Sequence, residues 1–237
     1  MPTLYLIPVP IAEDALHTLP AQTQSIAQNL GIFIVERSKT ARQFLKAVGI
    51  KKTMQEIEVT EIDDKDATVA ANALELAFKS GKDVGLLSEA GCPGVADPGA
   101  LVVAQAHQIG MKVQPLTGPS SLLLALMASG MNGQQFTFHG YLSPKRPELQ
   151  RDLRRLEQLS ERNNQTQIFI ETPYRSQMVL EVALESLQPA TQFCVAQDIT
   201  GAHEFIRSLP IAGWKKSTTI TLGKAPAVFL IYKKSSQ

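Results

Sequence analysis

The chain has 237 residues, enough to bury a sizeable core in one large domain or in two domains of average size. Its 23 Lys and Arg nearly balance its 22 Asp and Glu, which excludes a global polyanion binder and leaves only a local basic patch for contact with an acidic polymer. Cys92 and Cys194 provide neither a disulfide framework nor a zinc pattern, so we expect a reducing compartment and no metal. Without a signal pattern or an apolar run of roughly 18 residues, the chain is predicted to be soluble, cytoplasmic and free of membrane contact.

Apolar runs alternate with helical segments over the first half of the chain. The run at residues 3–9 is apolar almost throughout, which is typical of a strand buried on both faces of a parallel sheet. Further strands are expected at residues 32–35, 84–87 and 111–116, with an edge strand at 56–60. Helices are expected at residues 21–30, 38–48, 68–80 and 98–109. This rhythm predicts an α/β fold with a mostly parallel sheet.

A loop rich in Gly and Pro, residues 88–99, follows the expected strand at 84–87. Open α/β sheets bind ligands at the carboxyl ends of their strands, and glycine and proline together fix an unusual backbone path. The loop matches neither the P-loop nor the Gly-x-Gly-x-x-Gly pattern, so phosphate cradling is not indicated. An ordinary strand-to-helix connection remains the alternative.

The alternation of strands and helices is interrupted at residues 117–121, where Gly118, Pro119, Ser120 and Ser121 precede an apolar helix. Helix amino termini present free amides to polar ligands, although a capped buried helix explains the pattern equally well. We place a domain boundary here, with one α/β domain at residues 1–117 and a second at 118–237.

The second half is expected to hold a mixed sheet. Strands are predicted at residues 136–142, 167–171 and 192–196, and helices over about 151–162 and at 174–187. Residues 217–222 alternate Thr with Ile and Leu, residues 227–232 are apolar, and the turn between them predicts an antiparallel hairpin.

One dense basic cluster lies near the start of this half, at Lys145, Arg146, Arg151, Arg154 and Arg155. It is suited to contact a phosphate backbone, or else it is a solvated helix face diluted by acidic neighbours. No aromatic residues are interleaved for base stacking, which weakens the single-strand interpretation.

Five stretches of the sequence resemble one family of enzymes. They are Leu87-Ser88-Glu89-Ala90-Gly91-Cys92-Pro93-Gly94-Val95-Ala96-Asp97-Pro98-Gly99, Pro115-Leu116-Thr117-Gly118-Pro119-Ser120-Ser121, Phe138-His139-Gly140-Tyr141-Leu142-Ser143-Pro144-Lys145, Phe169-Ile170-Glu171-Thr172-Pro173-Tyr174-Arg175 and His203-Glu204. Together they resemble the tetrapyrrole methylase superfamily, in its branch of ribosomal RNA small subunit methyltransferases I.

The resemblance implies a methyltransferase that uses S-adenosylmethionine and releases S-adenosylhomocysteine. It implies two α/β domains with the donor in the cleft between them, a homodimer, and small-subunit ribosomal RNA as partner. The residues it places around the donor are Pro8, Glu89, Gly91, Val95, Ala96, Gly118, Ser120, Ser121, Ile170, Glu171, Ala196, Pro226, Ala227 and Val228.

The chain departs from this family in the loops that face the acceptor in relatives. The first loop reads Pro8-Val9-Pro10-Ile11-Ala12-Glu13-Asp14, without the usual glycine and asparagine. The usual Ala-Glu-Asp-Thr-Arg is replaced by Val35-Glu36-Arg37-Ser38-Lys39-Thr40-Ala41-Arg42, and a Tyr-His-Glu-His-Asn segment has no counterpart. The donor site is therefore better supported than the acceptor site.

Methyl transfer to a ribose hydroxyl requires positioning and profits from a nearby general base or polarising cation. The candidates are Glu36, Arg37, His203 and Glu204. Glu36 could instead form an exposed ion pair with Arg37 or Lys39, and His203 could be a structural hydrogen-bonding residue.

Two loop residues also have structural alternatives. Glu89, which replaces the family's aspartate, could cap local amides. Cys92 is interpreted as a small packing residue and not as a nucleophile.

Our main hypothesis is 2′-O-methylation of a ribose in small-subunit ribosomal RNA. The alternatives are an enzyme of the same fold that methylates another acceptor, such as a tetrapyrrole or another small molecule, and a diverged protein that binds the donor or its product without catalysis.

Overall fold

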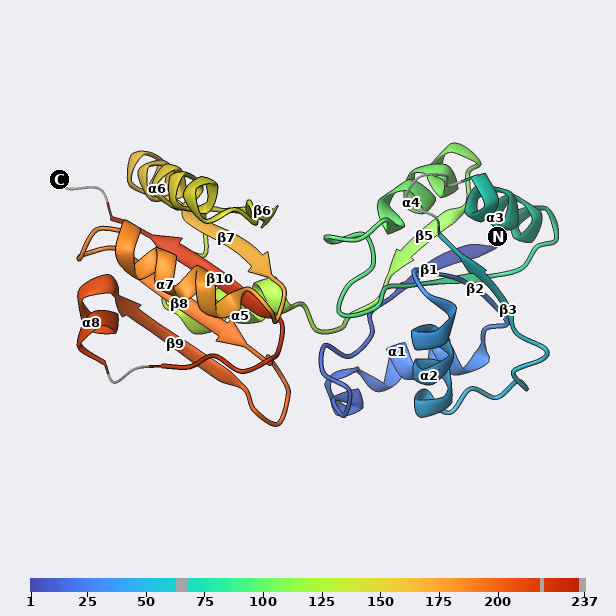
Figure 1. The fold of residues 1–237 in the computed structure, drawn as a ribbon. Coiled ribbons are helices and arrows are strands. Elements are labelled where there is room, and N and C mark those ends of the chain that lie inside the picture. Colours follow the sequence, from blue (N-terminus) through green and yellow to red (C-terminus); the bar gives the residue numbers. More distant parts are fainter. Residues whose placement is uncertain (63–67, 218–219, 235–237) are drawn as a thin grey trace. The chain divides into compact units, whose positions relative to one another are not determined.

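A computed structural model describes residues 1–62, 68–217 and 220–234 and divides the chain into two compact units (Figure 1). Unit 1 is Met1–Ser120 and unit 2 is Ser121–Gln237. Each unit has its own sheet and its own apolar clusters. The domain boundary at residues 117–118 stays a prediction.

Unit 1 is built on a parallel sheet with strand order β3-β2-β4-β1-β5. Its elements are β1 (Thr3–Ile7), the 3-10 helix η1 (Leu16–Thr18), α1 (Ala21–Asn29), β2 (Ile32–Val35), α2 (Ser38–Val48), β3 (Glu58–Glu61), α3 (Thr68–Lys79), β4 (Val84–Leu87), α4 (Gly99–Gln108) and β5 (Lys112–Pro115). The mostly parallel sheet expected for this half is confirmed, and β3 is its edge strand as predicted.

Helices cover both faces of this sheet, which explains why its inner strands are continuously apolar. One face packs Ile34 and Leu86 against Leu74 of α3 and Val102 of α4. The other face packs Phe33, Val35 and Leu87 against the helices α1 and α2, through residues such as Ala27 and Leu45. The carboxyl edge of the sheet therefore lies between two helical layers, where its loops can meet.

Unit 2 contains a mixed sheet with strand order β6-β7-β10-β8-β9. Only the pair of β6 and β7 is parallel; the other described pairs are antiparallel. The elements are α5 (Ser121–Ser129), β6 (Phe136–Tyr141), α6 (Arg146–Asn163), β7 (Thr166–Glu171), α7 (Ser176–Ser186), β8 (Gln192–Gln197), β9 (Phe205–Pro210), α8 (Ile211–Lys216) and β10 (Ala227–Tyr232). The expected mixed sheet is confirmed.

The two faces of this sheet are covered unequally. Helices α6, α7 and α8 pack on one face over an aromatic row, with ring centroids 5.3 Å apart for Phe169–Phe229 and 5.9 Å for Phe193–Phe229. Helix α5 covers the other face through Ala125 and Leu126. Figure 1 shows α5 on the side of the sheet away from α6 and α7.

The expected hairpin of residues 217–222 and 227–232 is wrong in its first strand. Residues 218–219 lie outside the described residues, and residues 220–222 form no strand. Strand β10 already pairs with β7 on one edge and β8 on the other, so it has no free edge for a hairpin partner. The Leu222 amide instead donates to Gln177 Oε1 at 3.0 Å.

Candidate functional site

The loop at residues 88–99 has a fixed shape held by its own hydrogen bonds. Gly91, Gly94 and Ala96 have φ of 74°, 79° and 63°, in the left-handed region that glycine tolerates and alanine adopts only under constraint. Asp97 Oδ1 accepts the amides of Gly94 at 2.6 Å and Gly99 at 2.9 Å. The loop therefore connects β4 to α4 along a defined path.

Asp97 is the ionisable group at the centre of this loop. Burial raises the pKa of its carboxyl group, and the hydrogen bonds from the Gly99 and Gly94 amides oppose that rise. Because one oxygen of Asp97 accepts both amides, this side chain holds the backbone at Gly94 close to the backbone at Gly99.

The end of β1 and the segment before α5 lie against this loop within unit 1. Val9 and Gly91 exchange two backbone hydrogen bonds, at 2.9 Å and 3.1 Å. The Cys92 thiol donates to the Pro119 carbonyl at 3.4 Å. A Cβ added at Gly118 would lie 2.3 Å from Pro8 Cβ, so only glycine allows this approach. The structure thus brings together Pro8, Gly91 and Gly118, three of the residues expected around the donor.

Other expected donor residues in unit 1 lie on the surface of this cluster. Val95 is 49% exposed, Ala96 is exposed, and Ser120 is half-buried. An exposed valine on a rigid loop gives an apolar contact surface at the carboxyl edge of the sheet.

Burial also raises the pKa of the Cys92 thiol, and the nearby Asp97 adds to this effect. The thiolate is disfavoured, which supports the interpretation of Cys92 as a packing residue.

Glu36 and Glu89 face each other where β2 and β4 end. Glu36 Oε2 accepts the Glu89 amide at 3.1 Å. The Glu89 carboxylate accepts the Thr40 hydroxyl at 3.3 Å and lies 3.5 Å from Arg37 Nε. Glu36 therefore positions the first residues of the loop, while Glu89 bonds to the start of α2.

A hollow of about 510 Å³ lies beside this pair, between the first loop and α2. We call it the α2 hollow; its lining is Val9, Pro10, Ile11, Ala12, Glu13, Leu16, Thr40, Ala41, Gln43, Phe44, Ala47, Ser88 and Glu89. Both of its charged lining residues, Glu13 and Glu89, are acidic. The hollow is thus formed by the divergent first loop, by α2 and by the first two residues of the 88–99 loop.

The expected donor residues of unit 2 gather at one end of its sheet. Ala227 pairs with Glu171 of β7 and Gln197 of β8, and Val228 pairs with Ile170 and Ala196. Ala196 and Val228 are buried against the α5 layer, and Pro226 is exposed just before β10. Ser121 is the first residue of α5.

Gln197 holds the turn that leads into Pro226. Its side-chain amide donates to the carbonyls of Gly223 at 2.9 Å and Ala225 at 2.8 Å, and its Oε1 accepts the Gly223 amide at 2.8 Å. Sequence reasoning missed this residue. The available signal was a glutamine placed directly after the apolar run at residues 193–196.

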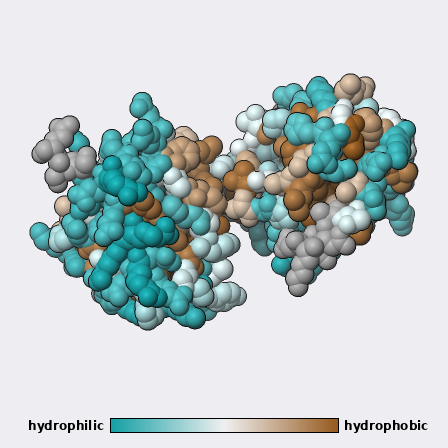
Figure 2. All heavy atoms as spheres, turned by 90° about the horizontal axis from the view of Figure 1, so that it is seen from above, coloured by the Kyte–Doolittle hydropathy of each residue, from teal (hydrophilic) through white to brown (hydrophobic). Residues whose placement is uncertain are grey.

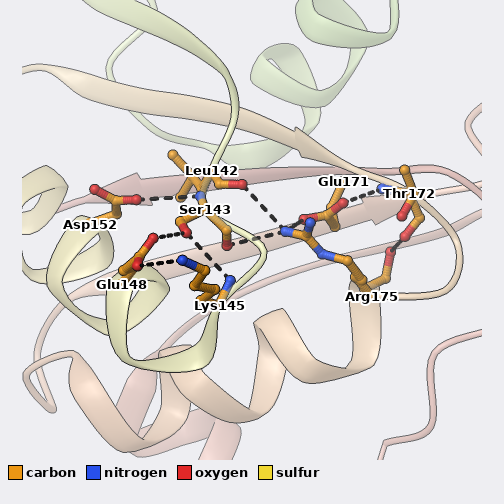
Figure 3. A network of polar contacts seen from close by, with 9 residues as sticks. Leu142, Ser143, Lys145, Glu148, Asp152, Glu171, Thr172 and Arg175 are labelled. Atoms are coloured by element: carbon orange, nitrogen blue, oxygen red, sulfur yellow. Dashed lines mark hydrogen bonds and ion pairs between the residues drawn. The ribbon is translucent and has the colours of Figure 1, made fainter.

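Glu171, one of the residues expected around the donor, is held by a hydrogen bond and an ion pair within unit 2 (Figure 3). Its carboxylate is almost fully buried, accepts the Thr172 amide at 2.7 Å through Oε1, and binds Arg175 Nη2 through Oε2. The same Nη2 donates to the carbonyls of Leu142 at 3.3 Å and Ser143 at 3.2 Å. Glu171 and Arg175 therefore tie the loop after β7 to the loop after β6.

His203 and Glu204 lie in a tight loop of unit 2. The His203 amide donates to Asp198 Oδ2 at 2.9 Å, and Glu204 Oε2 accepts the Thr200 amide at 2.8 Å. His203 is exposed and lines a second hollow of about 480 Å³ with Asp198 and Lys224. The Glu204 carboxylate stabilises the loop, whereas the imidazole faces solvent.

The three candidate bases are thus distributed over both units, Glu36 in unit 1 and His203 with Glu204 in unit 2. Among the described residues, no group of three or more His, Cys, Asp or Glu is placed to hold a metal ion. The part of the chain that the structure describes also contains no helix long and apolar enough to cross a membrane.

A unit with a parallel sheet followed by a unit with a mixed sheet defines a two-unit α/β protein. The chain belongs to the tetrapyrrole (corrin/porphyrin) methylase family, whose model matches residues 3–213, and it is a methyltransferase.

Two curated relatives carry the name ribosomal RNA small subunit methyltransferase I. The Vibrio cholerae protein is 29% identical over 211 residues, covering 89% of this chain and 69% of the relative. The Mesorhizobium japonicum protein is 33% identical over 207 residues, covering 87% of this chain and 67% of the relative. A crystal structure of uroporphyrin-III-C-methyltransferase from Thermus thermophilus shares the fold, with a TM-score of 0.55, 15% identity, and coverage of 98% of this chain and 92% of that one.

Proposed function

We propose that this methyltransferase uses S-adenosylmethionine to methylate the 2′-hydroxyl of a ribose in small-subunit ribosomal RNA. One observation carries the proposal: hydrogen bonds hold three segments of unit 1 together. Val9, just after β1, bonds to Gly91 of the 88–99 loop, and Cys92 of that loop bonds to Pro119. The names of the relatives from Vibrio cholerae and Mesorhizobium japonicum support the choice of acceptor.

The residues present fit the donor. An adenosyl group takes a mostly apolar slot with a few backbone hydrogen bonds, and most of the expected donor residues are small or apolar, with Glu89 and Glu171 as the charged members. Val95 in unit 1 and Pro226 in unit 2 are exposed apolar residues of this set. When bound, S-adenosylmethionine supplies an electrophilic methyl group.

The acceptor hydroxyl must lose its proton as it is methylated, and histidine is the side chain that most often acts as general base in such steps. His203 is exposed beside a hollow, whereas Glu36 and Glu204 each accept a backbone amide. We therefore propose His203 as the general base, with Glu36 and Glu204 as residues that position their loops.

One observation favours a second candidate, methylation of a smaller acceptor that is not an anion. Among the described residues that line the α2 hollow, the charged ones are Glu13 and Glu89, which repel phosphate. Apolar walls at Ile11 and Phe44 would suit a heterocyclic or cationic group.

The test of the proposal has two steps. Isothermal titration calorimetry with S-adenosylmethionine measures donor binding, and no heat at millimolar donor would contradict both enzyme functions. Labelled donor is then incubated with small ribosomal subunits from a strain that lacks this methyltransferase. We expect the label to enter the RNA, so that protease leaves it intact and ribonuclease removes it. Label in protein, or in small molecules from a cell extract, would favour the second candidate.

The histidine is tested in the same assay. His203→Gln should lower kcat at least about tenfold, since general-base catalysis contributes factors of this size or more, and leave donor affinity unchanged. His107→Gln, on the surface of α4 in unit 1, is the matched control. A kcat that stays within twofold of the parent enzyme would exclude His203 as the base.

We further propose a homodimer in the cytoplasm, where small ribosomal subunits are found. Light scattering after size exclusion should give twice the 25.8 kDa chain mass. A single-chain mass at micromolar concentration would contradict the dimer.

A further inference from the structure

Two tyrosines lie exposed where the parallel strands β6 and β7 end. Tyr141 is the last residue of β6, is 61% exposed, and pairs with Ile170 of β7. Tyr174 lies three residues beyond the end of β7 and is 89% exposed. Because parallel strands end at the same edge of a sheet, both rings belong to one edge of unit 2.

The backbone around both tyrosines is held in place. A register shift between Phe138 and Tyr141, with Gly140 at φ 66°, bends the end of β6. The Arg175 amide donates to the Thr172 carbonyl at 3.1 Å, which closes the turn that carries Tyr174. Arg175 also binds the carbonyls of Leu142 and Ser143, so it connects the two loops (Figure 3). Rings on a rigid backbone lose little freedom when they bind.

Exposed cations follow Tyr141 along the chain. The Lys145 side chain is 74% exposed, and Arg151 and Arg154 lie on the exposed side of α6. Among the described residues, neither Arg151 nor Arg154 has a carboxylate within 4.0 Å. The upper face of unit 2, where α6 lies in Figure 1, is mostly hydrophilic in Figure 2, with hydrophobic atoms in its middle and along one side.

Residues 145–155 carry five cations and two carboxylates, Glu148 and Asp152, so this stretch keeps a net positive charge. Glu148 accepts the Ser143 hydroxyl at 2.6 Å, and Asp152 lies 3.4 Å from the Ser143 amide (Figure 3). Glu157 is buried and accepts the Gln188 amide at 2.8 Å. The contact of Lys145 with Glu148, at 3.4 Å, is an exposed ion pair of the weak kind that a phosphate can replace.

We propose that Tyr141, Lys145, Arg151, Arg154 and Tyr174 form a binding surface for single-stranded RNA, which we call the tyrosine–arginine surface. Bases stack on the two tyrosines, and the phosphates that join them contact the three cations. The inference rests on the proposed function, and it identifies the segment of RNA beside the acceptor nucleotide as unpaired. The sequence order separates Tyr174 from the cations, so the combination exists only in the folded unit.

Fluorescence anisotropy with a labelled 12-nucleotide single strand, and with a duplex of the same sequence, tests the surface directly. Tyr174→Ala and Tyr141→Ala should each weaken single-strand binding at least about fivefold, since base stacking on an aromatic ring is worth that much or more. Tyr174→Phe keeps the ring and should restore binding. Phe136→Ala, at the opposite end of β6 and 42% exposed, is the matched control and should change nothing.

The cations are tested by their salt dependence. In the double variant Arg151→Gln and Arg154→Gln, the slope of log affinity against log salt concentration should decrease in magnitude by about 0.7 for each phosphate that is no longer neutralised. The tyrosine variants should keep the slope of the parent protein. Lys215→Gln with Lys216→Gln on α8 is the charge-matched control.

Three results would overturn the proposal: no single-strand binding by the parent protein, duplex binding as tight as single-strand binding, or tyrosine variants that bind like Phe136→Ala. Calorimetry with S-adenosylmethionine on every variant verifies folding. Label transfer to small ribosomal subunits is scored separately, so that a surface that fails in an active methyltransferase is distinguished from a failure of the proposed function.

Discussion

Glu171 shows at the scale of a single residue how burial decides what a carboxylate does. The resemblance places it around the methyl donor, yet its oxygens bind Thr172 and Arg175 inside unit 2. A buried carboxylate with a guanidinium partner is costly to disturb, because removing one charge leaves the other unpaired in a medium of low polarity. Through Arg175, Glu171 therefore helps to hold the loops after β6 and β7 together.

Replacing this carboxylate should reveal its structural role. Glu171→Gln should lower the free energy of unfolding by about 2 kcal/mol or more, because Arg175 loses its ionic partner. Glu75→Gln, which breaks the exposed pair with Lys79, should cost under about 0.5 kcal/mol. Urea unfolding monitored by circular dichroism measures both, and equal stability of the two variants would contradict the role given to Glu171.

Asp97 predicts a pH dependence with a definite sign. Burial raises its pKa, so the folded state holds the proton more tightly than the unfolded state does. The contribution of Asp97 to stability is therefore full at low pH and falls as pH rises through the raised pKa. Asp97→Asn removes this term while keeping an oxygen to accept both amides. Urea unfolding at a series of pH values from about 3 to 7 should show Asp97→Asn gaining stability relative to the parent as pH rises; a constant difference would refute the assignment.

At the scale of elements, the end of β1 and the segment before α5 approach closely because Gly118 has no side chain. The obstacle that a Cβ would meet is the Pro8 ring, which cannot turn away because it is closed onto its own backbone nitrogen. Thr23 of α1 strengthens the same junction by donating its hydroxyl to the Thr117 carbonyl at 2.8 Å. The position of residues 117–119 is thus set by both β1 and α1.

Gly118→Ala tests this junction. The added Cβ must displace the end of β1, so we expect a loss of about 1–3 kcal/mol in stability and a loss of S-adenosylmethionine affinity of about tenfold. Gly133→Ala, where a Cβ would meet nothing within 4 Å, should be neutral in both measurements. Thermal unfolding and calorimetry on the two variants provide the comparison, and unchanged donor affinity in Gly118→Ala would separate the junction from the donor site.

At the scale of the whole molecule, each unit encloses its own apolar clusters around its own sheet. The proposed donor residues come from both units, so binding should stabilise the folded chain beyond what either core supplies. S-adenosylmethionine at a hundred times its Kd should raise the free energy of unfolding by about 2.7 kcal/mol. Denaturant titration with and without S-adenosylmethionine measures this rise. Adenosine at the same concentration is the control ligand. An equally large rise with adenosine would show that the methionine half of the donor is not recognised.

Local pattern in the sequence was enough to predict most elements and both sheet types. Apolar runs such as residues 32–35 and 84–87 are β2 and β4, because a strand covered on both faces needs apolar residues at every position. The motif at residues 88–99 was enough to indicate the family, because that loop depends on glycines and prolines at fixed positions.

Tertiary structure decided what depends on partners far away in the chain. Residues 220–222 are no strand, since both edges of β10 are occupied. Arg175, which binds Glu171, also donates to the carbonyls of Leu142 and Ser143 in the loop after β6. Tyr141 meets the edge that carries Tyr174, since β6 and β7 are parallel neighbours. Hydrophobic periodicity reports which side of an element is buried, and it carries no information on which edge is free or which distant group lies opposite. The sequence alone therefore determined the framework and the family, and the folded chain determined which residues work together at its edges.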